Sequence, residues 1–198
     1  LLENHPYFEV VKLAASKNSA GKRYGDLMAN KWKLDMKIPE YTKDFIVEDA
    51  MDVKNVANGV KLIFCAVNLD KKELVALEEA YAKEEVVVVS NNSANRMKAD
   101  VPMIIPEINA KHLDIVDVQR KRLGTKKGFI VVKPNCSIQS YVPVFAAIKE
   151  FGIKEASICT YQAISGSGKT FEDWPEMVGN IIPYIGGEEE KSEKEPLK

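Results

Sequence analysis

The chain has 198 residues, and its 28 lysines and arginines nearly balance 29 aspartates and glutamates, so the formal net charge is −1. So small a net charge argues against a protein dedicated to binding nucleic acids or membrane surfaces. Hydrophobic residues make up 45% of the chain, and no apolar run approaches the roughly 18 residues that cross a bilayer. The three cysteines are too scattered for a disulfide framework or a zinc site. We therefore expect an ordinary globular protein in a reducing, cytoplasmic compartment, without a metal site.

Apolar runs of strand length recur along the chain. They are residues 9–15, 61–67, 86–89, 128–132 and 155–165. Between them, one helix is predicted to begin after Asp70, whose carboxylate can cap it, and to end near Glu84. Another is predicted over residues 138–148, with Gly152 as its C-terminal cap, although Pro143 should kink this helix or delay its start. Strands that alternate with helices over this length predict an α/β fold with a parallel sheet.

The residues between the strand at 128–132 and the next helix include Pro134, Asn135, Cys136 and Ser137. A cysteine at a helix N-terminus meets the positive end of the helix dipole, which favours the nucleophilic thiolate. The backbone N–H groups there can also hold an oxyanion. Cys136 is therefore a candidate nucleophile. The alternative is a small buried cysteine, with Ser137 acting as an ordinary helix cap.

The remaining reactive side chains carry weaker signals. Cys65 and Cys159 lie within apolar runs, so we expect both to pack in the interior. His5 and His112 have no partner at the spacing of metal ligands. The acidic run at residues 188–195 is typical of a solvated helix face.

Two loops could hold a nucleotide. Residues 163–170 nearly form a phosphate-binding P-loop, but Ala163 stands where that motif needs glycine, and the residues that follow make a poor helix. Gly166 and Gly168 still permit a ligand to approach the backbone closely. The loop at residues 16–22 carries hydroxyls and lysines and no acidic residue. Such a loop suits the 2′-phosphate of NADP, but a polar surface loop has the same composition.

Taken together, these segments resemble the aspartate-semialdehyde dehydrogenase family, in the style of its archaeal and fungal branch, over essentially the whole chain. The resemblance rests on residues 16–22, 90–97, 101–109, 134–137, 161–168 and 180–191. It implies a Rossmann-type parallel-sheet domain followed by the start of an α+β catalytic and dimerisation domain. The NADP-binding domain would cover residues 1–134, and the first part of the catalytic domain would cover residues 135–198.

The resemblance also implies an activity. The family carries out the NADP-dependent reductive dephosphorylation of 4-aspartyl phosphate to aspartate 4-semialdehyde, which would proceed here through a thioester on Cys136. This is a step in the biosynthesis of lysine (through diaminopimelate), threonine and methionine. The implied form is a homodimer or homotetramer that acts on a small molecule, with neither nucleic acid nor membrane as a partner.

By the same resemblance, individual residues acquire expected roles. Asn135 would hold the cysteine turn, and Gln162 would position the substrate beside Cys136. The substrate-binding residues would be Arg96, facing the phosphate, together with Glu188 and Lys191. The cofactor-binding residues would be Ser16, Ser19, Lys22, Ser165, Gly166, Ser167 and Gly168.

Other parts of the family's machinery are expected outside this stretch. The glycine-rich dinucleotide turn should precede the first residue, and the general-base histidine and a carboxylate-binding arginine should follow Lys198, so these 198 residues alone should be inactive. Three alternatives stay open. One is another acyl-phosphate reductase, such as an N-acetylglutamyl-phosphate reductase, whose motif typically carries glycine where Asn135 stands. The others are a nucleotide-binding module using residues 166–170 and a non-catalytic fragment that serves in assembly.

Overall fold

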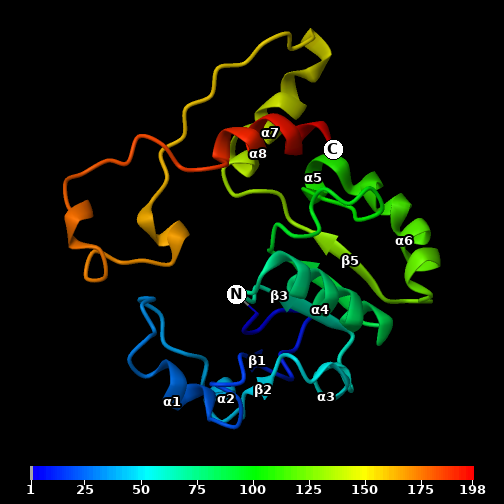
Figure 1. Cartoon of the computed structure of the whole chain (residues 1–198), viewed down its shortest axis with the longest axis vertical. Helices are drawn as coiled ribbons and strands as arrows, with labels where there is room; N and C mark the ends of the chain where they lie inside the picture. The colour runs from blue at the N-terminus through cyan, green and yellow to red at the C-terminus, as the bar shows by residue number, and fades with distance from the viewer. Residues whose placement is uncertain (1) are drawn as a thin grey trace. The chain divides into compact units, whose positions relative to one another are not determined.

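The computed structural model describes residues 2–198, which form two compact units (Figure 1). The first unit comprises residues 2–102 and 111–133. The second comprises residues 103–110 and 134–198.

A three-stranded parallel sheet forms the centre of the first unit. Its strands, in spatial order, are β3 (Leu62–Cys65), β4 (Val87–Ser90) and β5 (Phe129–Val132). The side chains of Val88 on β4 and Ile130 on β5 lie opposite each other and are fully buried. The apolar runs predicted as strands around residues 61–67, 86–89 and 128–132 are therefore confirmed.

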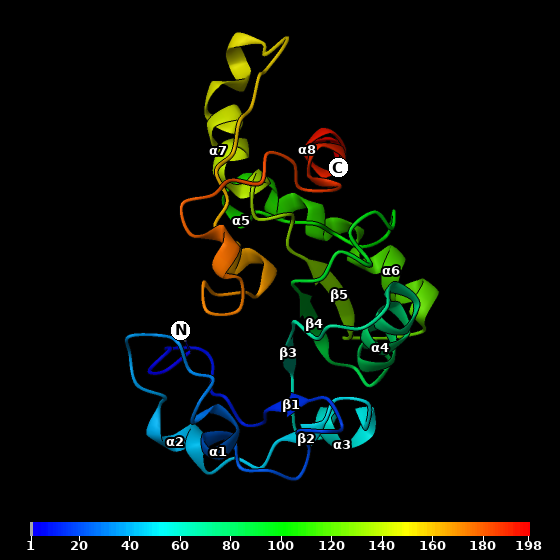
Figure 2. The same cartoon turned by 60° about the vertical axis from the view of Figure 1, so that its left-hand side comes forward.

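Two helices cover this sheet from the same side (Figure 2). α4 (Lys71–Lys83) packs against β4 and β5, and α6 (Val116–Leu123) packs against β5 and α4. Asp70 caps α4 as predicted, since its carboxylate accepts hydrogen bonds from the backbone N–H groups of Lys72, at 2.8 Å, and Glu73, at 3.2 Å. Tyr81 is buried on the inner face of α4 and donates its hydroxyl proton to the carbonyl of Ala50, at 2.6 Å.

A shorter parallel pair, β1 (Ala14–Ala15) with β2 (Glu48–Asp49), forms a second sheet in the same unit. The prediction of a strand over the whole of residues 9–15 is wrong in length. A ladder needs a neighbouring strand, and β2 offers only two residues to pair with.

Four short helices lie wholly or mainly in the first unit. They are α1 (Tyr24–Met28), α2 (Glu40–Lys43), α3 (Val53–Ala57) and the 3₁₀ helix η1 (Ala110–Ile115), which begins in the second unit.

The second unit is built from helices and extended segments. Its elements are α5 (Pro106–Asn109), α7 (Ile138–Ile148), η2 (Lys149–Phe151), η3 (Ile164–Ser167), η4 (Pro175–Met177), α8 (Glu188–Lys194) and η5 (Glu195–Leu197). α7 has the predicted bounds, and Pro143 lies inside it without delaying its start. Gly152 has a positive φ of 72° and closes η2 through a hydrogen bond to the carbonyl of Lys149. Both α7 and α8 contact η5.

The predicted strand at residues 155–165 is wrong. Residues 155–163 are extended and exposed, and η3 begins at Ile164. Within residues 2–198, the second unit contains no strand that could pair with this segment. Its β-branched and apolar residues therefore give it an extended backbone without a sheet.

Candidate active site

Cys136 is exposed on a turn immediately before α7. Its neighbours Asn135 and Ser137 are both buried. The side-chain oxygen of Asn135 accepts hydrogen bonds from the backbone N–H of Ser137, at 2.9 Å, and from its hydroxyl, at 2.8 Å. Asn135 rather than Ser137 thus supplies the side-chain oxygen that shapes the start of the helix. The turn presents the thiol at a helix N-terminus, and the alternative of a small buried cysteine is wrong.

Glu188, the first residue of α8, gathers three hydrogen-bond donors. Its carboxylate accepts from the side-chain amide of Asn135 at 3.0 Å, from that of Gln162 at 3.1 Å and from the ammonium group of Lys191 at 2.7 Å. Burial alone would raise the pKa of Glu188, but the hydrogen bonds from Lys191, Gln162 and Asn135 outweigh it and hold the pKa below its ordinary value. The structure therefore joins an ionised carboxylate, an ammonium group and two amides to the cysteine turn.

A second carboxylate reaches the same turn from the end of α8. Glu195 is buried, and it accepts a hydrogen bond of 2.7 Å from the backbone N–H of Asn135. The prediction of a solvated helix face for residues 188–195 is wrong for this glutamate. Sequence reasoning missed it because an acidic run gives all its glutamates the same appearance. The turn that carries Cys136 is thus held by side chains from both ends of the acidic segment.

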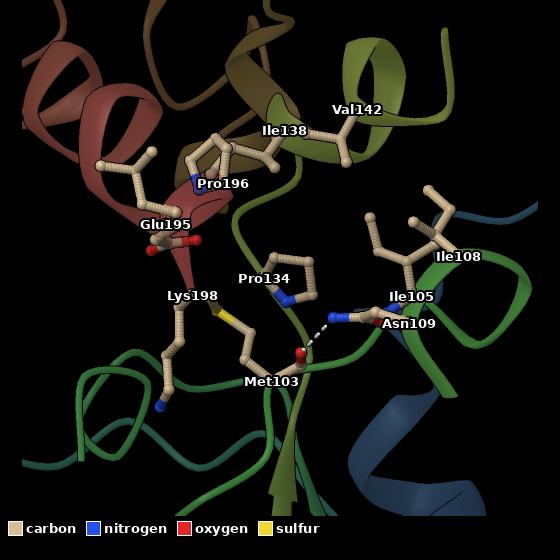
Figure 3. A pocket seen from close by; sticks show the side chains of 11 residues that line it. Met103, Ile105, Ile108, Asn109, Pro134, Ile138, Val142, Glu195, Pro196 and Lys198 are labelled. Atoms are coloured by element: carbon tan, nitrogen blue, oxygen red, sulfur yellow. Dashed lines mark hydrogen bonds between the residues drawn. The ribbon is translucent and has the colours of Figure 1, made fainter. Parts of the chain in front are cut away.

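A cavity of about 300 Å³ lies next to this turn, because Pro134, which directly precedes the turn, lies in its wall (Figure 3). Side chains of α7, Ile138 and Val142, face those around α5, Ile105 and Ile108 (Figure 3). The lining on these two sides is apolar, whereas Asn109, Glu195 and Lys198 add polar and charged groups elsewhere in the wall.

The serine- and glycine-containing segment at residues 165–168 forms most of η3 and is exposed. Gly168 ends it with a positive φ of 74°. Residues 171–173 form a turn, and Asp173 accepts hydrogen bonds from both the backbone N–H and the hydroxyl of Thr170. A P-loop would open a helix at this point. The geometry therefore contradicts the nucleotide-binding module based on residues 166–170.

In the first unit, the loop at residues 16–22 follows the carboxyl end of β1. Ser16 and Lys22 are exposed, and Ser19 is half-buried. The backbone N–H of Ser19 donates to the carbonyl of Ser16 at 2.8 Å, which turns the chain back on itself. The loop thus carries hydroxyl groups and a lysine at the end of a parallel strand, where α/β proteins commonly bind nucleotides.

Arg96 lies in the loop that follows β4, at residues 90–97. It is buried, and its guanidinium group donates a hydrogen bond of 3.1 Å to the carbonyl of Asn91. Sequence reasoning missed Glu78, a buried carboxylate of α4 that accepts hydrogen bonds from this loop. Helical spacing could have predicted that Glu78 is buried, because it falls four residues after Leu74 and three before Tyr81, on the face of α4 that packs inward.

The sequence model of a protein family described as "Semialdehyde dehydrogenase, NAD binding domain" matches residues 1–116, which is more than half of the chain. The chain belongs to the semialdehyde dehydrogenase family. Its first unit is accordingly a Rossmann-like domain of the NAD-binding type, with the parallel sheet and covering helices described above.

The individual relatives of this chain are named more specifically than the family, as aspartate-semialdehyde dehydrogenases. An aspartate-semialdehyde dehydrogenase from Methanothermobacter thermautotrophicus is 42% identical over 198 residues, covering all of this chain and 55% of the relative. One from Aspergillus fumigatus is 36% identical over 200 residues, covering all of this chain and 53% of the relative. The crystal structure of aspartate semialdehyde dehydrogenase with NADP from Candida albicans superposes with a TM-score of 0.77 at 34% identity, over 98% of this chain and 54% of that one. The chain thus spans about half the length of the relatives it matches.

The two other cysteines of this semialdehyde dehydrogenase chain differ from each other. Cys65 is buried on β3, as predicted, and its burial, together with the nearby charge of Glu78, raises the pKa of its thiol to about 12. Cys159 is exposed, so the prediction that it packs in the interior is wrong. It lies in the extended segment before η3, which has no sheet to cover it within the described chain.

No helix within residues 2–198 is both long and apolar enough to cross a membrane. No group of three or more histidines, cysteines, aspartates or glutamates lies close enough together in that range to hold a metal ion.

Proposed function

We propose that this chain is part of an NADP-dependent aspartate-semialdehyde dehydrogenase, and that it supplies the nucleophile and most of the substrate site. One observation carries the proposal: exposed Cys136 lies on a turn that Asn135 ties to a cluster of Glu188, Gln162 and Lys191. A reaction on an acyl phosphate that carries an amino acid needs a nucleophile beside both an anionic and a cationic group. Cys136 is the nucleophile, and the cluster supplies the anionic Glu188 and the cationic Lys191.

The chemistry follows from the position of the thiol. The thiolate of Cys136 would attack the carbonyl carbon of 4-aspartyl phosphate and form a carbon–sulfur bond, and phosphate would leave as the carbon–oxygen bond breaks. Backbone N–H groups in the first turn of α7 would stabilise the oxyanion of this step. NADPH, when bound, would supply the hydride that reduces the remaining thioester. Collapse of the thiohemiacetal breaks the carbon–sulfur bond, releases aspartate 4-semialdehyde and returns the thiolate.

The surrounding residues would divide the recognition of the substrate. Glu188 would hold the substrate's ammonium group, and Lys191 would bind one of its anionic groups. Glu188 and Lys191 now form an ion pair with each other, and contacts to the substrate would replace part of it. Gln162 would orient the carbonyl that Cys136 attacks. Arg96 would bind the departing phosphate. The hydrogen bond that Asn135 donates to Glu188 and the one that it accepts from Ser137 would keep the thiol in register with these groups.

The cofactor would lie on two segments. The hydroxyls of Ser16 and Ser19 and the ammonium group of Lys22 suit the 2′-phosphate of NADP, since no carboxylate occurs between residues 16 and 22. The second segment would approach the nicotinamide and comprises Ser165, Gly166, Ser167 and Gly168. The first unit would thus serve cofactor binding, and the second would form the first part of the catalytic and dimerisation domain.

The setting of the enzyme belongs to the same proposal. An exposed nucleophilic thiol must stay reduced to act, which supports a cytoplasmic location. Several large apolar side chains of the second unit are exposed, which supports assembly into a homodimer or homotetramer. They include Phe151, Val178, Ile181 and Tyr184. Light scattering of the full-length protein, meaning a polypeptide of the relatives' length that contains this chain, would measure that assembly.

The function is tested by turnover of the full-length protein. We expect NADPH to form, as followed by its absorbance, when aspartate 4-semialdehyde, NADP and inorganic phosphate are supplied together. Omitting phosphate should stop turnover, because phosphate is needed to release the acyl group from Cys136. A preference for N-acetylglutamate semialdehyde would contradict the proposal in favour of the related acyl-phosphate reductase.

The cofactor preference is tested by Lys22→Ala in the same protein. Lys22 is exposed, so its removal should leave the fold intact while removing a cation from the 2′-phosphate. We expect the affinity for NADP to fall about tenfold and that for NAD to stay within about twofold, because hydrogen bonds to charged groups contribute about 1.5–3 kcal/mol. Lys17→Ala, in the same loop, is the matched control. Equal losses for both cofactors would contradict the assignment.

A further inference from the structure

A fully buried carboxylate lies under the loop that carries Arg96. Glu78 projects from α4, and none of its side chain is exposed to solvent. It accepts hydrogen bonds from the hydroxyl of Ser90 at 2.5 Å, from the side-chain amide of Asn92 at 3.2 Å and from that of Asn95 at 2.6 Å. In the described part of the chain, no lysine or arginine forms an ion pair with Glu78. Three neutral donors therefore hold this carboxylate.

All three donors belong to one short segment. Ser90 is the last residue of β4, and Asn92 and Asn95 lie in the loop that follows. Asn92 also reaches β3, where its amide lies 3.5 Å from the carbonyl oxygen and from the sulfur atom of Cys65. One oxygen of the Glu78 carboxylate accepts from Ser90 and Asn92, where the loop leaves β4, and the other accepts from Asn95, further along the loop. The carboxylate thus fixes the loop at both places.

Arg96 is attached to this arrangement at two points. Its backbone directly follows Asn95, and its guanidinium group donates to the carbonyl of Asn91, next to Asn92. Any shift of the loop that breaks the contacts to Glu78 therefore moves Arg96 at both its ends. An apolar side chain at position 78 would avoid the cost of burying a charge, but it could not accept three hydrogen bonds.

We infer that Glu78 is a positioning residue for phosphate recognition: by accepting hydrogen bonds from Ser90, Asn92 and Asn95, it holds the loop in the conformation in which Arg96 binds the phosphate group. This inference rests on the proposed function, which gives Arg96 that role. It adds a residue from α4 that does not contact the substrate.

The test measures phosphate binding in the full-length protein with Glu78→Gln. A glutamine keeps the shape of the side chain but turns one acceptor oxygen into a donor that opposes the donors of the loop. We expect the affinity for inorganic phosphate, measured by calorimetry, to fall about tenfold or more, because hydrogen bonds to charged groups are stronger than those between neutral groups. The affinity for NADP should stay within about twofold. In turnover, the KM for phosphate should rise by a larger factor than the KM for the aldehyde.

Two further variants separate positioning from stability. Leu77→Ala removes the buried neighbour on the same helix and should destabilise the protein without a selective loss of phosphate affinity. Asn92→Ala removes one donor to Glu78. Because Asn92 is only half-buried, this variant should fold, and it can test the inference even if Glu78→Gln does not fold. It should weaken phosphate binding by roughly threefold or more, and by less than Glu78→Gln does, because it removes one of the three donors to the carboxylate together with the long contacts to Cys65.

The outcomes are distinct. A selective loss of phosphate affinity in Glu78→Gln and Asn92→Ala supports the inference. Losses no larger than that of Leu77→Ala, or wild-type protein that does not bind phosphate, would overturn it. Binding is measured without turnover, so a protein that binds phosphate selectively through this loop but does not oxidise aspartate 4-semialdehyde would contradict the proposed function and leave the positioning inference standing.

Discussion

The side-chain amide of Asn135 donates a hydrogen bond of 3.0 Å to the carboxylate of Glu188, which lies 53 positions further along the chain. This contact joins the residue beside the exposed thiol to the first turn of α8. The same carboxylate accepts from Lys191, so a disturbance of Glu188 reaches both the cysteine turn and the cationic group. Glu188 is therefore the residue through which the proposed site is held together.

Replacing Glu188 by glutamine should impair the proposed reaction more than it impairs the fold. The variant removes the charge that holds Lys191. It also replaces one acceptor oxygen by an amide NH₂ group, which is a donor and therefore opposes the donors already present. We expect kcat/KM for aspartate 4-semialdehyde to fall roughly 10–100-fold, the equivalent of about 1.5–3 kcal/mol for hydrogen bonds to a charged group. Steady-state kinetics of the full-length protein would measure this. Glu189→Gln, at the exposed next position, is the control, and equal losses in the two variants would refute the assignment.

Acid should weaken the first unit through Glu85. Its carboxylate accepts hydrogen bonds from the backbone N–H groups of Lys126, Lys127 and Gly128, which lower its pKa to about 2. Because the folded-state pKa lies below the unfolded one, the stabilisation is present at neutral pH and is lost as the pH falls from about 5 towards about 2.

This dependence can be isolated by urea unfolding over that pH range. The Glu85→Gln variant should lose less stability on acidification than the wild-type protein does, and Glu84→Gln, at the preceding exposed position, should behave like the wild type. Parallel curves for all three proteins would show that these hydrogen bonds do not contribute to the acid response.

Gly128 permits the close approach of the chain before β5 to the end of α4. A Cβ atom at this position would lie 1.9 Å from the carbonyl oxygen of Ala82 and 3.0 Å from the Cα of Glu85. Because both are backbone atoms, Gly128→Ala should lower the free energy of unfolding by about 3 kcal/mol or more. At Gly166, a Cβ would meet no atom of residues 2–198 within 4 Å, so Gly166→Ala should leave the melting temperature nearly unchanged. Similar melting temperatures for the two variants would contradict the packing described here.

The parts of the fold that sequence reasoning predicted correctly are those with strong local signals. The valine run at 86–89 becomes β4 because continuous β-branched residues favour a buried strand. The capping carboxylate of Asp70 fixes the start of α4, and apolar spacing gives the bounds of α7. The prediction of a strand at residues 155–165 is wrong, since the pattern indicates a local preference but not whether a partner strand is present.

The candidate site divides in the same way. The position of Cys136 before a helix is visible in the order of elements, but only the structure shows that its thiol is exposed while Asn135 and Ser137 on either side are buried. The contacts of Glu195 and Glu78 are not visible, because each depends on which distant backbone or amide group the fold brings within reach. For Glu78, helical spacing places the residue on the buried face, but it does not identify the three donors.

The central claim is that Cys136 is the nucleophile, and acylation of the full-length protein tests it most directly. The protein is mixed with aspartate 4-semialdehyde and NADP in the absence of phosphate, so that the acyl group cannot be released, and the peptides are then analysed by mass spectrometry. The account predicts about one equivalent of NADPH and an aspartyl adduct on Cys136, with none on the exposed Cys159, and neither product in Cys136→Ala. An adduct on another residue, or turnover by Cys136→Ala at the wild-type rate, would contradict it.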